Sequence, residues 1–255
     1  MPTPAVIFDL DDTLIVEQDF AMASLREALT VFPGIDPDET EDVALDAIRQ
    51  VWRLGSNHSR CLNIGIASWE GLWATFEGNH PSLDGLREWS ATYRAEAWDA
   101  VVSRLGIAET QLSEIASKRF QEAQRRGHPV KEGASATLDV LTNHFRIGLL
   151  TNGSSDLQRL KLAQSGMGAY FDAVVISGEV GVGKPSEAIF SEILEQLDAR
   201  PEDSIMVGDS WERDIVGATN AGMSALWLAS RRPIPGTRER VTAINDLEDV
   251  RQLVS

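Results

Sequence analysis

Four short stretches of the sequence carry side chains that could do chemistry. They are Asp9-Leu-Asp11-Asp12-Thr13, Thr151-Asn152-Gly153, Lys184-Pro185 and Gly208-Asp209-Ser210. Carboxylates are ionised near neutral pH and can act as nucleophiles, proton carriers or ligands of a hard cation. A lysine ammonium and a threonine hydroxyl can hold the oxygens of an anion. These residue types suit a site that binds an anionic substrate together with a cation.

Each of these stretches follows a short apolar run, and these runs are the elements that must position it. The runs lie at 5–8, 146–150, 173–176 and 204–207, with a fifth at 224–228, and segments of helical period such as 186–198 and 212–221 lie among them. Runs that are apolar on both faces are typical of strands buried in a parallel sheet. Alternating strands and helices predict a doubly wound α/β sheet, whose ligand crevice lies outside the carboxyl ends of the strands. All four polar stretches therefore point to one site.

The stretch from 18 to 127 has no strand-like run. Its apolar residues recur at helical spacing, at Leu25, Ala28, Leu29 and Phe32, at Leu45, Ile48 and Trp52, and at Leu112, Ile115, Ala116 and Phe120. Five of the seven tryptophans lie here, and we expect their rings to fill the core of a small bundle: Trp52, Trp69, Trp73, Trp89 and Trp98. Pro129 and Gly133 mark the return to the sheet. We predict an α/β core from 1–17 and 128–255 and an inserted all-helical domain from 18–127.

Composition and charge limit the partners of the chain. Its 255 residues are 43% hydrophobic and 24% charged, as in folded globular proteins. The net charge of −16 gives no attraction for a nucleic-acid polymer or an anionic membrane, so local charges must hold any anionic substrate. A single cysteine, Cys61, excludes an internal disulfide and a cysteine-rich zinc site. No run approaches the ~20 apolar residues of a membrane span and the start lacks signal-peptide features, so we expect a cytoplasmic protein.

Each polar stretch taken alone has a structural explanation. Aspartate often ends a strand, Thr151 or Ser210 could cap a helix, and most lysines are solvated. The combination is harder to explain in this way. Only four lysines occur in the chain, and Lys184 lies between a glycine-rich turn and a proline at the predicted crevice. We therefore interpret the set as a functional site.

Four motifs, in order, resemble those of the haloacid dehalogenase (HAD) superfamily. They are Ile7-Phe-Asp-Leu-Asp-Asp-Thr-Leu14, Leu149-Leu-Thr-Asn-Gly153, Gly183-Lys-Pro185 and Met206-Val-Gly-Asp-Ser-Trp-Glu-Arg-Asp-Ile215, the last continued by Gly217-Ala-Thr-Asn-Ala-Gly-Met223. The match covers 5–16 and about 130–230, whereas the helical stretch carries no motif. The sequence resembles the phosphatase branch with a helical C1-type cap. This resemblance implies a Rossmann-like core and a Mg²⁺-dependent hydrolase of phosphoric monoesters.

The resemblance also implies a metal site. A strand order of 5-4-1-2-3 would place the first and fourth strands side by side, so that the carboxylates of Asp9 and Asp209 converge, with Asp214 nearby. Carboxylates packed together repel one another and need a cation, and oxygen-only ligands favour Mg²⁺ over Zn²⁺. The family uses the side chains of Asp9 and Asp209 and the backbone carbonyl of Asp11 as direct ligands. We expect Asp214 to bind directly or through water.

The same resemblance implies a role for each remaining motif residue. Asp9 is the expected nucleophile and would form an aspartyl phosphate. Asp11 would protonate the leaving oxygen and later take a proton from the hydrolytic water. The phosphate oxygens would be held by the Lys184 ammonium, the Thr151 hydroxyl and backbone amides near Asn152 and Gly153.

Other polar residues near the motifs are expected to have structural roles. The side chains of Asp12 and Thr13 should bond the backbone of the tight turn after the first strand. Arg53, His58 and Arg60 could contact the leaving group of the substrate, but a solvated loop is the favoured explanation.

Alternative functions need consideration. Residues 178–184 fit the Walker A spacing of a P-loop nucleotide-binding protein, but position 185 is proline where Ser or Thr should bind the metal. A haloacid dehalogenase on the same fold would use Asp9 on carbon without Mg²⁺, and the departing halide would not need the proton of Asp11. A phosphomutase would use the same two aspartates. A non-catalytic binding protein would have little reason to retain every acid and the lysine.

The predicted partner is a small phosphorylated substrate. Nucleoside monophosphates, sugar phosphates and small phospho-acids all fit, because the helical stretch offers no recognisable code for the leaving group. A nucleic-acid polymer and a membrane are not expected as partners, and the chain is predicted to be a monomer or a homodimer.

Overall fold

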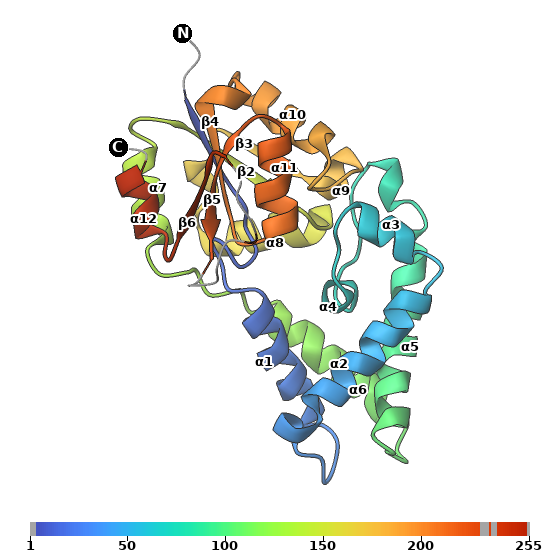
Figure 1. Ribbon diagram of the computed structural model, residues 1–255. Coiled ribbons are helices and arrows are strands. Elements are labelled where there is room, and N and C mark those ends of the chain that lie inside the picture. Colours follow the sequence, from blue (N-terminus) through green and yellow to red (C-terminus); the bar gives the residue numbers. More distant parts are fainter. Residues whose placement is uncertain (1–3, 230–234, 236–238, 254–255) are drawn as a thin grey trace.

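The computed structural model describes residues 4–229, 235 and 239–253, and its centre is a parallel sheet (Figure 1). The strands are β1 (Ala5–Phe8), β2 (Arg146–Thr151), β3 (Ala173–Ile176), β4 (Ser204–Gly208), β5 (Ser224–Leu228) and β6 (Val241–Ile244). They lie in the order β3-β2-β1-β4-β5-β6, which confirms the predicted α/β class and the 5-4-1-2-3 order. Strand β6 was not predicted, because Thr242 interrupts its short apolar run. Residues 1–3, 230–234, 236–238 and 254–255 of the predicted core lie outside the described residues.

The register of β1 places its end between the ends of two neighbouring strands. Phe8 pairs with Leu149 on β2 and with Val207 on β4. The next residue, Asp9, continues the ladder by donating its amide to the Val207 carbonyl at 3.0 Å. Polar residues that follow β1, β2 and β4 therefore meet at one edge of the sheet.

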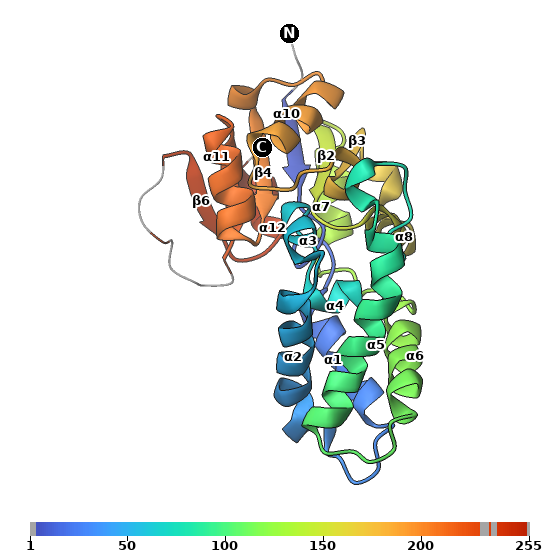
Figure 2. The same ribbon diagram turned by 90° about the vertical axis from the view of Figure 1, so that its right-hand side faces the viewer.

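Helices cover both faces of the sheet (Figures 1 and 2). Val6 and Phe8 pack in a cluster with α7 (Ala134–Leu141), α8 (Ser155–Ser165) and α12 (Glu248–Leu253), whereas Ala5 and Ile7 pack with α10 (Glu187–Gln196) and α11 (Gly217–Asn220). This burial on both faces explains the continuous apolar sequence of β1. Shorter elements are α9 (Ser177–Val180), the 3₁₀ turns at Gly168–Tyr170 and Pro201–Asp203, and a π-helical turn at Trp211–Val216.

Residues 18–124 form helices and, in the described part of the chain, contribute no strand to the sheet. The helices are α1 (Gln18–Leu29), α2 (Pro37–Leu54), α3 (His58–Asn63), α4 (Ser68–Gly71), α5 (Leu86–Arg104) and α6 (Leu112–Gln124), with a 3₁₀ turn at Pro81–Leu83. They have a hydrophobic core of their own, which includes Trp52, Trp73, Trp89 and Trp98. Trp69 is half-buried and packs against this core, whereas Ile115 of the helical pattern is 49% exposed. No helix among the described residues combines the length and apolarity needed to cross a membrane.

Two backbone segments connect the helices to the sheet, and they pair with each other. Val16 donates its amide to the Pro129 carbonyl at 2.8 Å, and Lys131 donates its amide to the Leu14 carbonyl at 2.9 Å. The Lys131 ammonium also donates to the Asp12 carbonyl. The chain therefore enters and leaves the helical segment beside the turn that follows β1. The division into core and cap domains stays a prediction.

Candidate active site

A cavity of about 150 Å³ lies at the carboxyl edge of the sheet. Six of the eight predicted site residues line it: Asp9, Asp11, Asn152, Lys184, Asp209 and Asp214. The helical segment contributes Gln18, Gly65, Ala67, Trp69 and Glu70 to its lining. The cavity thus combines the polar ends of the strands with one loop of the helical segment.

Lys184 is the buried cation of this cavity. Its Nζ lies 2.6 Å from Asp9 Oδ1 and 2.6 Å from Asp214 Oδ1, and it donates to the Leu150 carbonyl at 2.8 Å. Burial opposes the charged form of the amine, but Asp214 and Asp9 outweigh this effect and raise the pKa of Lys184. The ammonium therefore stays charged beside the two carboxylates.

Three carboxylates gather around this ammonium. Oxygen atoms of Asp9, Asp209 and Asp214 lie within 4.8 Å of one another. Burial, together with repulsion from Asp9 and Asp214, raises the pKa of Asp209 to about 7. A Cβ at Gly208 would lie 2.4 Å from Asp214 Oδ2, so glycine is needed for the close approach of Asp214. Arg213 also lines the cavity, and the clustered oxygens of the three aspartates could bind a metal ion.

Asn152 fixes the backbone that carries Lys184. Its Oδ1 accepts the Lys184 amide at 2.8 Å, and its Nδ2 donates to the Lys184 carbonyl at 3.0 Å. A Cβ at Gly183 would lie 2.8 Å from Asn152 Oδ1. The side chain of Asn152 is thereby occupied in positioning the lysine, and the absence of a side chain at Gly183 allows this contact.

Thr151 and Gly153 do not line the cavity. The Thr151 hydroxyl is buried and accepts a hydrogen bond from Gln158 Nε2 at 2.6 Å. The Gly153 amide donates to Ser177 Oγ at 2.8 Å. Both groups support the loop after β2 in this structure, and their assignment to the phosphate stays a prediction.

The carboxylate of Asp11 is held from helix α8. Gln158 Nε2 donates to Asp11 Oδ2 at 2.9 Å, and Lys161 Nζ donates to Oδ1 at 3.1 Å and to Oδ2 at 3.2 Å. Burial raises the pKa of Asp11 well above its ordinary value, against the opposing effect of Lys161 and with smaller contributions from neighbouring carboxylates. Asp11 is therefore easier to protonate than an ordinary aspartate.

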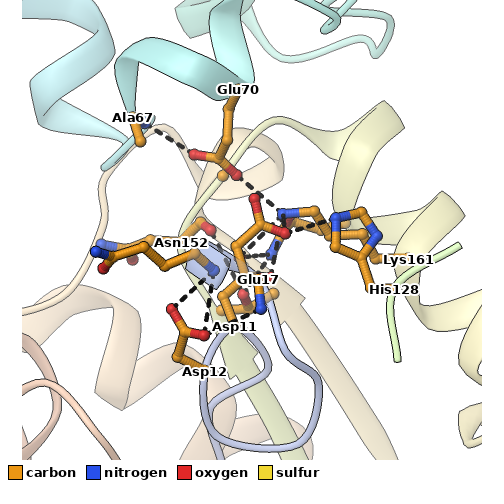
Figure 3. Close-up of polar contacts among 12 residues, drawn as sticks. Asp11, Asp12, Glu17, Ala67, Glu70, His128, Asn152 and Lys161 are labelled. Carbon is orange, nitrogen blue, oxygen red and sulfur yellow. Dashed lines mark hydrogen bonds and ion pairs between the residues drawn. The ribbon is translucent and has the colours of Figure 1, made fainter. Parts of the chain in front are cut away.

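Lys161 is itself the centre of a buried ionic cluster (Figure 3). Its Nζ lies 3.1 Å from oxygens of Glu17 and Glu70 as well as Asp11. His128 Nε2 lies 2.7 Å from Glu17 Oε2. Burial opposes ionisation of Glu17, but Lys161 and His128 lower its pKa to about 2. This cluster joins the sheet, both connecting segments and helix α4.

A comparison with protein families assigns the chain to a known group of enzymes. The family model described as haloacid dehalogenase-like hydrolase matches residues 3–222. The chain belongs to the haloacid dehalogenase-like hydrolase family. The resemblance based on the four motifs is therefore confirmed.

Two curated relatives of this hydrolase are phosphatases. It is 32% identical over 247 residues to a phosphoserine phosphatase from Thermus thermophilus, covering 96% of each chain. It is 30% identical over 257 residues to a glyceraldehyde 3-phosphate phosphatase from Methanothermobacter thermautotrophicus, covering 98% of this chain and 99% of the relative. The solved structure of the putative HAD-hydrolase YfnB from Bacillus subtilis, bound to magnesium, is similar with a TM-score of 0.66 at 22% identity, covering 100% and 99% of the two chains. This last similarity concerns the fold alone.

The two other polar residues of the first motif organise the site of the hydrolase. Asp12 has a left-handed φ of 57° and accepts the amides of Glu17 at 3.0 Å and Gln18 at 3.2 Å, so its side chain bonds backbone at the start of α1. The Thr13 hydroxyl donates to Asp9 Oδ2 at 3.3 Å and accepts the Asp209 amide at 3.1 Å. Thr13 therefore links the ends of β1 and β4, whereas the sequence predicted bonds within its own turn.

The cap residues considered in the sequence lie elsewhere. Arg53 pairs with Asp46 at 3.8 Å, Arg60 donates to the Asp84 carbonyl, and His58 contacts the Trp52 ring edge-on at 6.1 Å between centroids. None of Arg53, His58 and Arg60 lines the cavity.

The sequence analysis missed the residues that surround Asp11. Gln158 and Lys161 are three positions apart on α8 and so lie on one helix face. Their position shortly after Thr151-Asn152-Gly153, and the scarcity of lysine, were the only available signals. The sequence carries no signal for Glu17, Glu70 and Trp69, because no local pattern distinguishes them from surface residues of a helix.

Proposed function

We propose that this hydrolase is a Mg²⁺-dependent phosphomonoesterase that acts on a small phosphorylated metabolite through an aspartyl phosphate on Asp9. One observation carries the proposal. The carboxylates of Asp9 and Asp11 line the same cavity as Lys184, whose buried ammonium is paired with Asp9. The phosphatase names of both curated relatives support the same reaction class.

Asp9 is the proposed nucleophile. An oxygen of its carboxylate forms a bond to phosphorus while the bond to the leaving oxygen breaks, and Asp11 donates a proton to that oxygen. Water then attacks the phosphorus of the aspartyl phosphate. The bond from phosphorus to Asp9 breaks, and Asp11 takes the proton of the water. The raised pKa of Asp11 suits the donor half of this cycle.

The residues of the acidic cluster fit a divalent cation. The donors are carboxylate oxygens from Asp9, Asp209 and Asp214, and we propose the backbone carbonyl of Asp11 as a further ligand. When bound, Mg²⁺ would supply positive charge to the phosphate oxygens. Lys184 holds its ammonium at the same wall, and we propose that Thr151, Asn152 and Gly153 complete the phosphate site. The relative YfnB is described as bound to magnesium, which supports this choice of ion.

The helical segment is proposed as a cap over the leaving group. Gly65, Ala67, Trp69 and Glu70 line the same cavity as the catalytic carboxylates, and they come from one loop and helix α4. They replace Arg53, His58 and Arg60 as the residues that would contact the leaving group.

The alternative functions explain the arrangement less well. In a dehalogenase the departing halide would need no proton, so Asp11 would have no role as a proton donor. In a P-loop protein the lysine would face a phosphate held by its own loop, whereas Lys184 lies against Asp9 and Asp214. A phosphomutase would give an isomeric sugar phosphate rather than free phosphate, so product analysis separates it from a phosphatase.

The test is release of inorganic phosphate from a panel of phosphomonoesters by the purified full chain. We expect turnover with Mg²⁺, none after metal stripping in EDTA, and recovery on adding Mg²⁺ back. Asp9→Asn should fold, as judged by circular dichroism, and lose all but about one per cent of the activity. Full activity in EDTA, or in Asp9→Asn, would contradict the proposal.

A further inference from the structure

We propose that Lys161 is a positioning residue that couples the seating of the helical segment, through Glu70, to the orientation of the Asp11 carboxylate. This inference rests on the proposed function, because the role of Asp11 as proton carrier gives the coupling its effect. It is carried by one ammonium that contacts carboxylates from three separate segments (Figure 3).

The first step concerns Asp11. In the described part of the chain, every hydrogen bond to its side chain comes from Gln158 or Lys161 of helix α8. The turn after β1 fixes the backbone of Asp11, whereas α8 decides which way its carboxylate points. A small rotation of the Lys161 ammonium would therefore move both Asp11 oxygens.

The second step concerns Lys161. Its side chain has no exposed surface, and its Nζ lies 3.1 Å from Asp11, from Glu17 and from Glu70. An ammonium has three N–H donors, and each needs a partner when water is excluded. The orientation of the Lys161 ammonium therefore depends on all three carboxylates being in place.

The third step concerns the cap side. Glu70 Oε1 accepts from Lys161, while Glu70 Oε2 accepts the Ala67 amide at 2.8 Å within the first turn of α4. Trp69 Nε1, from the same turn, donates to Glu17 Oε1 at 3.2 Å. The loop that lines the cavity thus reaches the cluster at two points, through Glu70 at Lys161 and through Trp69 at Glu17, and both contacts depend on the position of α4.

These contacts form one chain of interactions from the cap wall to the proton carrier. With the segment seated, Glu70 takes one donor of Lys161 and leaves the remaining donors to Asp11 and Glu17. Displacement of α4 removes Glu70 and frees the ammonium to turn. Lys161 thereby aligns Asp11 when the cavity is closed to bulk water.

The test uses Glu70→Gln, which keeps the shape of the side chain. The Lys161 ammonium and the Ala67 amide are both donors, so the NH₂ of glutamine must oppose one of them. Lys161→Met is a second variant. Because it leaves three carboxylates without their cation and can destabilise the fold, Glu70→Gln carries the test alone if Lys161→Met does not fold. The matched control is Thr75→Val, since Thr75 Oγ1 also connects the helical segment to α8, through Asp156 Oδ2 at 2.9 Å, without touching Asp11.

The measurement is the ratio of kcat/KM for nitrophenyl phosphate to kcat/KM for the best alkyl phosphate of the panel. This ratio reports the first chemical step, and only the alkoxide needs a proton from Asp11. We expect Glu70→Gln and Lys161→Met to raise the ratio by about 10-fold or more and Thr75→Val to leave it within about two-fold. In an Asp11→Asn background, Glu70→Gln should not change the ratio further.

Two results would overturn the inference alone: equal losses on the two esters, or an effect of Glu70→Gln on the ratio that persists without Asp11. A wild-type chain that hydrolyses no phosphomonoester would instead overturn the proposed function, and the inference with it. Melting temperatures of all variants separate loss of fold from loss of positioning.

Discussion

Lys184 Nζ lies 2.6 Å from Asp9 Oδ1, in a buried ion pair that joins the loop after α9 to the end of β1. Neither residue could occupy this place alone, because an uncompensated charge is costly inside a protein. The pair fixes the position of Asp9 Oδ1. It also holds a positive charge beside Asp9, where the proposed mechanism places the incoming phosphate.

Replacement of Lys184 by Met should therefore affect both stability and activity. Asp9 and Asp214 would lose their shared partner, and breaking a buried ion pair of this kind costs roughly 3–5 kcal/mol. We expect a lower melting temperature in EDTA, partly restored by Mg²⁺, and a fall in kcat/KM of roughly 10²–10³-fold. Thermal melts and phosphate release test these two expectations. Wild-type kcat/KM in the variant would remove Lys184 from the mechanism.

The pKa of Asp209, raised to about 7, predicts how the stability of the metal-free protein changes with pH. Between the ordinary pKa of 3.8 and about 7, folded Asp209 holds a proton that the unfolded chain has released. Stability in EDTA should therefore fall as the pH rises through this range. Asp209→Asn removes the titration, so its free energy of unfolding relative to wild type should increase by about 1 kcal/mol or more from about pH 5 to pH 8.

Urea denaturation at the two pH values measures this difference. Saturating Mg²⁺ serves as the control, because the cation should stabilise the wild type at the higher pH and have less effect on Asp209→Asn. If the free energy of unfolding in EDTA changed equally with pH in the two proteins, Asp209 would not be the carboxylate with the raised pKa.

The third prediction concerns Thr13, whose hydroxyl bridges Asp9 and the Asp209 amide. Thr13→Val keeps the shape but removes the hydroxyl that accepts the partly buried Asp209 amide, at a cost of about 1–3 kcal/mol. We expect kcat/KM to fall by about 10-fold, and Thr13→Ser, which keeps the hydroxyl, to retain most of the activity. Steady-state kinetics and urea denaturation of the pair provide the comparison. Equal activity of the Val and Ser variants would leave the bridge without a catalytic role.

The sheet and half of the site follow from local sequence. Continuous apolar runs identify β1 and β4 because both faces of these strands are buried, and the motif residues at their ends must meet at one edge. The strand order that brings Asp9 and Asp209 together came from the family resemblance rather than from the apolar runs. Strand β6 escaped the same reasoning because Thr242 interrupts its short apolar run.

The surroundings of Asp11 could not be predicted in this way. Lys161 and Glu70 are far apart in the sequence and meet only because the fold brings α4 close to α8. Nothing local distinguishes a buried glutamate from a solvated one, since the difference lies in a partner supplied by another element. The same limit applies to Trp69, which packs against the bundle core while its indole N–H donates to Glu17.

The most direct test of the central claim is to trap the phosphoryl group on Asp9. Asp11→Asn should allow attack on nitrophenyl phosphate, whose anion leaves without a proton, and should slow the attack of water on the intermediate. Rapid acid quench after mixing with ³²P-labelled nitrophenyl phosphate and Mg²⁺, followed by peptide mapping, should find hydroxylamine-sensitive label on Asp9. Label on another residue, or release of phosphate with no label at any time point, would contradict the account.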